Sequence, residues 1–296
     1  GPTPLPERGR LALAKDMIHH RKSEFMAIMG RVQEGLRTLF GTAGTVLPLT
    51  SSGTGAMTAA VYNLFAPGEK VLVVEGGKFG QRWREIAVSR GLEVVTVSVP
   101  WGNAVEPQDV ADALAADPAI VGVLVQHSET STGVLHPVRE IAAVTRKSPA
   151  LLLVDGISAV GLAPCPMDQW GIDCLVTGSQ KGLLLPPGLA LLALSPRGWE
   201  KAAATVTGCF YFNLPKEKAK VEQGQTLFTP AINLLVALFV GLSVGSNVVV
   251  ARNLGGKRHD MVGRAVHTSI LMALVSGAIL AVFGFFAARQ LLVWMS

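Results

Sequence analysis

The sequence predicts an α/β fold in which helices cover both faces of a mostly parallel β-sheet. Between residues 40 and 200, short apolar runs rich in β-branched side chains alternate with longer helical patterns. Near-continuous apolar runs are typical of strands that are buried on both faces. The alternation of such strands with amphipathic helices indicates helical crossovers, which parallel strands require.

The pattern places five strands and four helices in order along the chain. The predicted strands are residues 71–75, 93–99, 121–125, 151–155 and 174–177. The predicted helices between or beside them are residues 55–64, 81–90, 107–115 and 137–146. Ligands of such sheets bind beyond the carboxyl ends of the strands, so residues just after each strand are the first candidates for a site.

Composition divides the chain into a near-neutral domain, residues 1–230, and an apolar, basic tail, residues 231–296. The whole chain is 49% hydrophobic and 16% charged, which excludes an intrinsically disordered protein. The tail holds five of the 26 basic residues but only one of the 21 acidic residues. The net positive charge therefore belongs to the tail and is no evidence for nucleic-acid binding.

Two uncharged segments of the tail predict apolar helices. Residues 231–251 and 265–288 contain no Asp, Glu, Lys or Arg. As helices they would be roughly 32 and 36 Å long, enough to cross a hydrocarbon core about 30 Å thick. We expect transmembrane helices that contact a membrane through both segments; two helices buried in a large soluble core are the alternative.

The cysteines and the amino-terminal residues indicate a reducing compartment for the first domain. Cys165, Cys174 and Cys209 are odd in number and form no Cys-x-x-Cys pair, so neither a disulfide framework nor a metal site is expected. The chain opens Gly-Pro-Thr-Pro-Leu-Pro, which lacks the apolar region of a signal peptide. We therefore expect a cytoplasmic location for this domain.

A carboxylate and a lysine follow two consecutive predicted strands. Asp155 ends one strand, and Lys181 follows the next one among glycine and serine residues. A lysine in a cleft of low dielectric can form a Schiff base with a carbonyl group. A carboxylate beside it could keep a pyridinium nitrogen protonated, so that a pyridoxal ring acts as an electron sink. A solvated ion pair is the simpler alternative.

A run of small residues precedes the predicted helix 55–64. Residues 50–56 read Thr-Ser-Ser-Gly-Thr-Gly-Ala. Free backbone N–H groups at a helix N-terminus bind anions, such as the phosphate of a cofactor. An ordinary helix cap is the alternative. The run is not a Walker motif, because no Gly-Lys-Ser/Thr follows it.

Together these motifs resemble the class V branch of the fold-type I pyridoxal-phosphate enzymes, specifically the alanine–glyoxylate and serine–glyoxylate aminotransferases. The resemblance covers about residues 1–231. The motifs that carry it are Gly1-Pro-Thr-Pro4, Met17-Ile-His-His-Arg21, Ser51-Ser-Gly-Thr-Gly55, Gly77-Lys-Phe-Gly-Gln-Arg82, His127-Ser-Glu-Thr-Ser-Thr-Gly133, Val154-Asp155, Gly178-Ser-Gln-Lys181 and Phe228-Thr-Pro230. It implies the large domain of a fold-type I enzyme, the cofactor pyridoxal 5′-phosphate, and transamination between alanine or serine and a 2-oxo acid such as glyoxylate.

The resemblance also implies roles for individual residues. Lys181 matches the lysine that forms the Schiff base and shuttles the proton, and Asp155 matches the partner of the pyridine nitrogen. The phosphate is matched by Ser52, Gly53 and Thr54 with Gln180 nearby, the phenolic oxygen by Thr130, and the two ring faces by Ile157 and Phe79. Thr229 matches a phosphate contact that relatives supply from the neighbouring subunit, which implies a homodimer.

Cysteine desulfuration is the nearest competing chemistry in class V. It expects a histidine directly before the lysine and a mobile catalytic cysteine, whereas Gln180 precedes Lys181 here. Transamination is therefore favoured. His19, His20 and His127 have no partners at metal-ligand spacing and are expected to be structural.

The tail departs from the aminotransferase pattern after Thr229. The resemblance implies a small C-terminal domain whose arginine holds the substrate carboxylate, and nothing after Thr229 resembles it. Residues 232–296 resemble instead a two-helix fragment of a multidrug and toxic-compound extrusion (MATE) transporter, through 241–255 and Arg264-Ala-Val-His-Thr-Ser269. We therefore predict a hybrid chain whose transamination is impaired. A transporter fragment that carries an aminotransferase head as passenger is the competing hypothesis.

Overall fold

The computed structural model describes residues 2–242, in which seven strands form one sheet of order β1-β9-β8-β7-β4-β2-β3. The strands are β1 (Val46–Leu49), β2 (Lys70–Glu75), β3 (Glu93–Ser98), β4 (Ile120–Gln126), β7 (Leu151–Asp155), β8 (Cys174–Gly178) and β9 (Ala190–Leu194). β9 runs antiparallel to its neighbours β1 and β8, and the other neighbouring pairs are parallel. Six of these seven strands therefore share one direction, which confirms the mostly parallel sheet.

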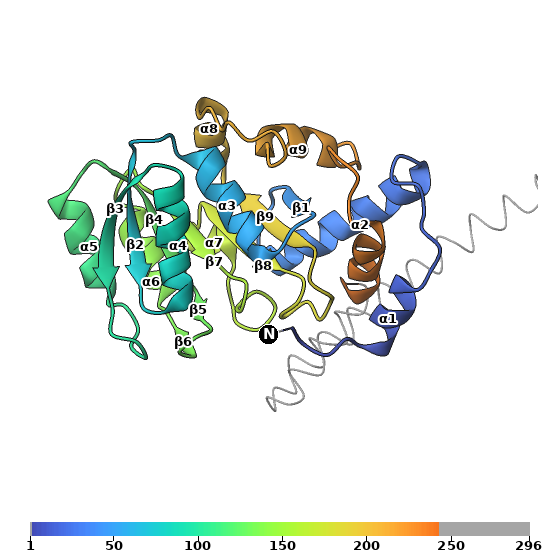
Figure 1. The fold of residues 1–296 in the computed structure, drawn as a ribbon, viewed down its shortest axis with the longest axis horizontal. Helices are drawn as coiled ribbons and strands as arrows, with labels where there is room; N and C mark the ends of the chain where they lie inside the picture. The colour runs from blue at the N-terminus through green and yellow to red at the C-terminus, as the bar shows by residue number, and fades with distance from the viewer. Residues whose placement is uncertain (1, 243–296) are drawn as a thin grey trace, which may run out of the picture. The chain divides into compact units, whose positions relative to one another are not determined.

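Helices pack against both faces of this sheet (Figure 1). One face is covered by α3 (Gly53–Leu64), α4 (Lys78–Ser89), α8 (Pro196–Ala204) and α9 (Leu214–Val221), whose apolar residues share a core cluster with Leu151 and Leu153 of β7. The alternate residues Leu152 and Val154 are fully buried as well. Because successive strand residues point to opposite faces, the second face must also be covered.

Five further helices lie within residues 2–221. They are α1 (Glu7–Leu13), α2 (Ser23–Phe40), α5 (Pro107–Ala116), α6 (Val138–Thr145) and α7 (Met167–Trp170). α2 contacts β1, α5 contacts β3, and α6 contacts β7. A two-stranded hairpin, β5 (Ser128–Glu129) and β6 (Val134–Leu135), follows β4.

The five predicted strands match β2, β3, β4, β7 and β8, and the four predicted helices match α3 to α6, each to within three residues. The strands β1 and β9 were not predicted. β1 is only four residues long and contains Pro48, which removes a backbone donor. Such a strand is tolerated at the edge of a sheet, which is where β1 lies.

Residues 232–242 are helical and contact the first two helices of the chain. Asn233 Nδ2 donates to the carbonyl oxygen of Leu13 at the end of α1. The guanidinium of Arg31 in α2 lies 5.5 Å from the ring centroid of Phe239. The compact unit that contains the sheet accordingly reaches Gly241. The domain boundary at residue 230 stays a prediction.

Residues 243–251 of the first predicted apolar segment, and all of the second segment, 265–288, lie outside the described residues. Of the first predicted apolar segment, only residues 231–242 are described. Within residues 2–242, no helix combines the length and the hydropathy that a membrane span needs.

The packing of Gly122 in β4 against Phe65 provides a stability test. A Cβ atom added to Gly122 would lie 2.4 Å from Cζ of Phe65, whose side chain is fully buried. We expect Gly122→Ala to lower the free energy of unfolding in urea by about 1–3 kcal/mol, because the core is overpacked. The control is Gly30→Ala in α2, where the added Cβ meets no atom within 4 Å and helix propensity should raise stability by up to about 1 kcal/mol. Equal stability of the two variants would contradict this packing.

Candidate active site

One cavity collects residues from five strands that run in the same direction. The loops after β1, β2, β4, β7 and β8 leave the same edge of the sheet, since Gln126 pairs with Asp155 and Asp155 pairs with Val176. The cavity has a volume of about 240 Å³. It is lined by Pro2, Ser52, Gly53, Thr54, Phe79, Arg82, Thr130, Asp155, Ile157, Ser158, Gln180 and Lys181. The structure therefore brings together nine of the ten predicted site residues, all except Thr229.

Asp155 is a buried acid at the end of β7, only 4% exposed. Its Oδ1 accepts a hydrogen bond of 2.8 Å from the backbone N–H of Ile157, and no group in the described part of the chain bonds to Oδ2. Burial raises the pKa of Asp155 to about 7, against the opposing effects of the Ile157 hydrogen bond and of the Arg82 and Lys181 charges. A cationic ligand group beside Oδ2 would favour the ionised form.

Lys181 lies on the loop after β8 and lines the same cavity. Within residues 2–242 its ammonium group is not within 4.0 Å of any carboxylate, so the simple ion pair with Asp155 is absent from this part of the chain. The amino-terminal segment contacts this loop, because the N–H of Thr3 donates to the Gln180 carbonyl at 3.1 Å and its hydroxyl donates to the Lys181 carbonyl at 3.1 Å. The loop backbone that carries Lys181 is thus bonded to the amino-terminal segment.

The first turn of α3 supplies backbone donors to the cavity. The first N–H groups of a helix have no acceptor within it, and the side chain of Ser52, which precedes α3, does not cap them. A Cβ at Gly53 would lie 2.4 Å from Cδ1 of Ile157, so any larger residue here would require the Ile157 side chain to shift. The arrangement suits an anion, because the helix dipole adds to the free N–H groups.

Three residues without an assigned role in the sequence analysis shape the cavity. The hydroxyl groups of Ser158 and Thr130 lie 2.6 Å apart. Arg82 Nη1 donates to Thr54 Oγ1 at 3.2 Å. Glu129, fully buried, accepts hydrogen bonds of 3.1 Å from the N–H groups of Phe79 and Gly80 and so binds the start of α4. The spacing of Phe79 and Arg82, one helical turn apart, is the signal that could have revealed Arg82.

His127 is buried beneath this edge of the sheet, with its ring edge-on to Trp170 at a centroid distance of 5.7 Å. Burial lowers the pKa of His127 to about 4. The imidazole is therefore neutral near pH 7. This packing fits a structural position, but Nδ1 of His127 is buried without a hydrogen-bond partner among the described residues, which differs from the hydrogen-bonded histidine expected.

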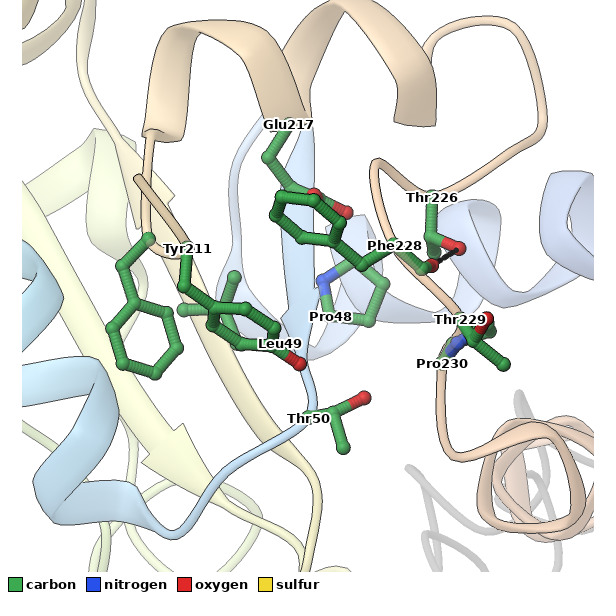
Figure 2. A pocket seen from close by; sticks show the side chains of 10 residues that line it. Pro48, Leu49, Thr50, Tyr211, Glu217, Thr226, Phe228, Thr229 and Pro230 are labelled. Atoms are coloured by element: carbon green, nitrogen blue, oxygen red, sulfur yellow. Dashed lines mark hydrogen bonds between the residues drawn. The ribbon is translucent and has the colours of Figure 1, made fainter. Parts of the chain in front are cut away.

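Thr229 lies at a different place, on the exposed loop that precedes the helix 232–242. It lines a second, smaller pocket together with Tyr211, Phe228 and Thr50 (Figure 2). In Figure 2 the Thr226 hydroxyl donates to the carbonyl of Phe228, at 2.7 Å, and folds this loop back on itself. Thr229 therefore does not line the cavity of its own chain. Its predicted contact with the phosphate bound by a neighbouring subunit stays a prediction.

The family model described as "Aminotransferase class-V" matches residues 9–247. The chain belongs to the class-V aminotransferase family. A second family model, MatE, matches residues 224–296, which agrees with the transporter resemblance of the tail.

Curated relatives of this aminotransferase chain carry several names. The soluble hydrogenase 42 kDa subunit of Anabaena cylindrica is 41% identical over 82% of this chain, and the chain spans only 64% of that relative's length. The L-aspartate–glyoxylate aminotransferase of Paracoccus denitrificans is 35% identical, with coverage of 91% of this chain and 69% of the relative. The serine–glyoxylate aminotransferase of Methylorubrum extorquens is 36% identical, with 80% and 62% covered.

Solved structures show the same fold. An aspartate aminotransferase of subgroup IV from Thermus thermophilus superimposes with a TM-score of 0.78 at 36% identity, covering 89% of this chain and 71% of that one. An alanine–glyoxylate aminotransferase from Nostoc sp. gives a TM-score of 0.79 at 29% identity, covering 82% and 66%. The described unit is therefore a fold-type I large domain with a mixed seven-stranded sheet.

Membership of this family implies pyridoxal phosphate as cofactor, and the donor set of the cavity fits that molecule. The α3 N-terminus suits a phosphate, and the buried Asp155 suits a protonated ring nitrogen. The side-chain oxygen of Gln180 is buried without a partner among the described residues, which leaves it available to a ligand. An amine, Lys181, lies at the same cavity.

The buried Asp155 predicts a pH dependence of stability in the absence of cofactor. Between pH 4 and 7 the folded protein keeps a proton on Asp155 that the unfolded chain releases, so stability falls as pH rises. We expect Asp155→Asn to remove this contribution, so that its advantage over the parent grows with pH by at most about 1.4 kcal/mol per unit. Urea unfolding across this range measures it.

A control separates Asp155 from the second buried acid. Burial also raises the pKa of Glu217 to about 7, so Glu217→Gln should remove a separate share of the slope. If Asp155→Asn and the parent have the same pH dependence, Asp155 is ionised throughout this range.

Proposed function

We propose that this chain binds pyridoxal phosphate in the cavity and transfers an amino group between a small amino acid, alanine or serine, and glyoxylate. The observation that carries the proposal is the convergence of Asp155, Lys181 and the N-terminus of α3 on one cavity. The names of relatives support glyoxylate as the acceptor, since they include an L-aspartate–glyoxylate and a serine–glyoxylate aminotransferase. The amino donor varies among those names, so alanine and serine are proposed as the first donors to test.

Each residue has a physical task in this proposal. The cofactor, when bound, supplies an electron sink for the negative charge that develops at the substrate Cα. The carboxylate of Asp155 would keep the proton on the ring nitrogen, and Nζ of Lys181 would take the proton from Cα. The Thr130 hydroxyl would bond the phenolic oxygen of the ring. Ile157 and Phe79 would hold the two ring faces and exclude water.

The cysteines support transamination over desulfuration. None of the three lines the cavity. Burial raises the pKa of Cys165 to about 12 and that of Cys174 well above its usual range, so neither provides a thiolate near pH 7. Cys209 is half-buried and lies outside the cavity lining.

We expect turnover by this chain to be slow. Productive transamination needs a cation that orients the substrate carboxylate. Among the described residues, Arg82 and Lys181 are the basic side chains at the cavity; Lys181 is assigned to proton transfer, and Arg82 bonds to Thr54 in the first turn of α3. Turnover of alanine or serine with glyoxylate near a typical enzyme rate of ~10 s⁻¹ would contradict this expectation.

Removal of Lys181 tests the proposed function. We expect Lys181→Ala to lose the visible absorbance of covalently bound pyridoxal phosphate and to lower turnover at least about 100-fold. Asp155→Asn should keep the absorbance and lower turnover, because a neutral amide cannot hold the ring nitrogen protonated. The control is Lys78→Ala, at an exposed lysine of α4 outside the cavity lining. A parent chain that shows no absorbance change with pyridoxal phosphate would overturn the proposal.

A homodimer is part of this proposal. Thr229 is exposed, and the nearby Phe210 and Tyr211 expose 82% and 47% of their surface. Tyr211 and Phe228 stack with ring centroids 5.0 Å apart, so the exposed aromatic side chains form one patch. Exposed apolar patches of this kind are typical of protein interfaces. We propose that this patch contacts a second copy and places Thr229 at that copy's phosphate.

A charge in the aromatic patch tests the dimer. We expect Phe210→Asp to raise the dimer dissociation constant at least about tenfold, because an aspartate would be buried without a partner. Sedimentation equilibrium measures this constant. Trp101→Asp is the matched control, since Trp101 is also exposed, at 58%, but lies on the loop after β3. A monomeric parent, or an unchanged constant for Phe210→Asp, would refute this interface.

A further inference from the structure

Arg82 brings an uncompensated positive charge to the cavity. It lines the cavity, and within residues 2–242 no carboxylate oxygen lies within 4.0 Å of its nitrogens. Arg84, two residues later on the same helix, pairs instead with Glu75 at 2.8 Å. Asp155 is the acid among the residues that line the cavity, and burial raises its pKa to about 7. A partly buried guanidinium without a counter-ion favours an anionic ligand.

Contacts of Arg82 show where that anion would lie. Its Nη1 donates to Oγ1 of Thr54 at 3.2 Å, and Thr54 is in the first turn of α3. The guanidinium carbon lies 4.8 Å from the ring centroid of Phe79, so the planar group is held against that ring. Two sources of positive potential, the α3 dipole and the guanidinium, therefore meet at one end of the cavity.

The first turn of α4 is itself held in place, which limits the positions that Arg82 can take. Glu129 accepts from the N–H groups of Phe79 and Gly80, and Ser131 accepts from the N–H of Lys78 at 3.0 Å. These bonds fix the helix start one turn before Arg82. An arginine that is oriented before the ligand arrives loses less conformational entropy on binding.

We propose that Arg82 is a direct binding residue for the phosphate of the cofactor, and that it completes the anion site begun by the N-terminus of α3. The inference rests on the proposed function, because it takes pyridoxal phosphate as the ligand. A guanidinium can donate two parallel hydrogen bonds to phosphate oxygens, and a charged donor bonds more strongly than the neutral backbone groups. Arg82 would thus bind the phosphate and leave the reacting end of the ring to Lys181.

The test compares two ligands that differ only in the phosphate. Pyridoxal phosphate and pyridoxal are titrated against the parent chain, Arg82→Gln and Arg82→Lys, and visible absorbance gives each dissociation constant. We expect Arg82→Gln to raise the constant for pyridoxal phosphate about 10- to 100-fold and to change that for pyridoxal less than about twofold. Arg82→Lys should lie between the parent and Arg82→Gln, because it keeps the charge without the planar group.

A second readout uses inorganic phosphate alone and needs no bound cofactor. Millimolar phosphate should raise the thermal midpoint of the parent more than that of Arg82→Gln, because a ligand of the folded state stabilises it. Arg84→Gln is the matched control, with the same loss of charge on α4 outside the cavity, and should match the parent in both experiments.

Two results of these titrations would refute the role of Arg82 without affecting the proposed function. An equal loss of affinity for both ligands would mean that Arg82 acts through Phe79 on the ring, and unchanged affinity for pyridoxal phosphate would mean that Arg82 does not bind it. Either result overturns the inference while the proposed function stands. If the parent chain binds neither ligand, the proposed function and this inference both fail.

Discussion

The shared direction of five strands is the constraint on which the candidate site depends. Parallel neighbours that end in register bring the loops after β2, β4, β7 and β8 to one edge of the sheet. β9 runs the opposite way and pairs with β1, so that β1 is turned to the common direction and its loop reaches the same edge. Residues from position 52 to position 181 therefore meet around one cavity. If β9 ran parallel to β8 and still paired antiparallel with β1, then β1 would point the opposite way. The loop between β1 and α3 would then lie at the opposite edge of the sheet.

The cavity has two electrostatic features, a buried acid and a region of positive potential, and one ligand could interact with both. Asp155 is buried deeply enough to retain a proton, whereas Arg82 and the α3 N-terminus present positive potential without an acidic partner among the described residues. A ligand with a phosphate at one end and a basic ring nitrogen at the other would neutralise both imbalances. These two features of the lining thus suit the polarity of pyridoxal phosphate.

The carboxyl end of the described unit shows how two family resemblances share one segment. The class-V aminotransferase model ends at residue 247, and the MatE model begins at residue 224. In the structure, Asn233 bonds to the end of α1, and Leu235 and Leu238 are buried. Residues 232–241 therefore belong to the same compact unit as the sheet, and the domain boundary at residue 230 stays a prediction.

The sequence predicted the α/β class and the five central strands, and it marked Asp155 and Lys181 as candidates that follow neighbouring strands, because these signals are local: apolar runs, small residues and a charged residue at a strand end. Family resemblance added Phe79, Thr130 and Thr229. Tertiary structure alone decided that Arg82 bonds to Thr54, 28 residues earlier, and that Glu129 holds the start of α4. It also decided that Thr229 lies away from its own chain's cavity. Hydrogen bonds between distant segments depend on the register and direction of strands, which no local pattern specifies.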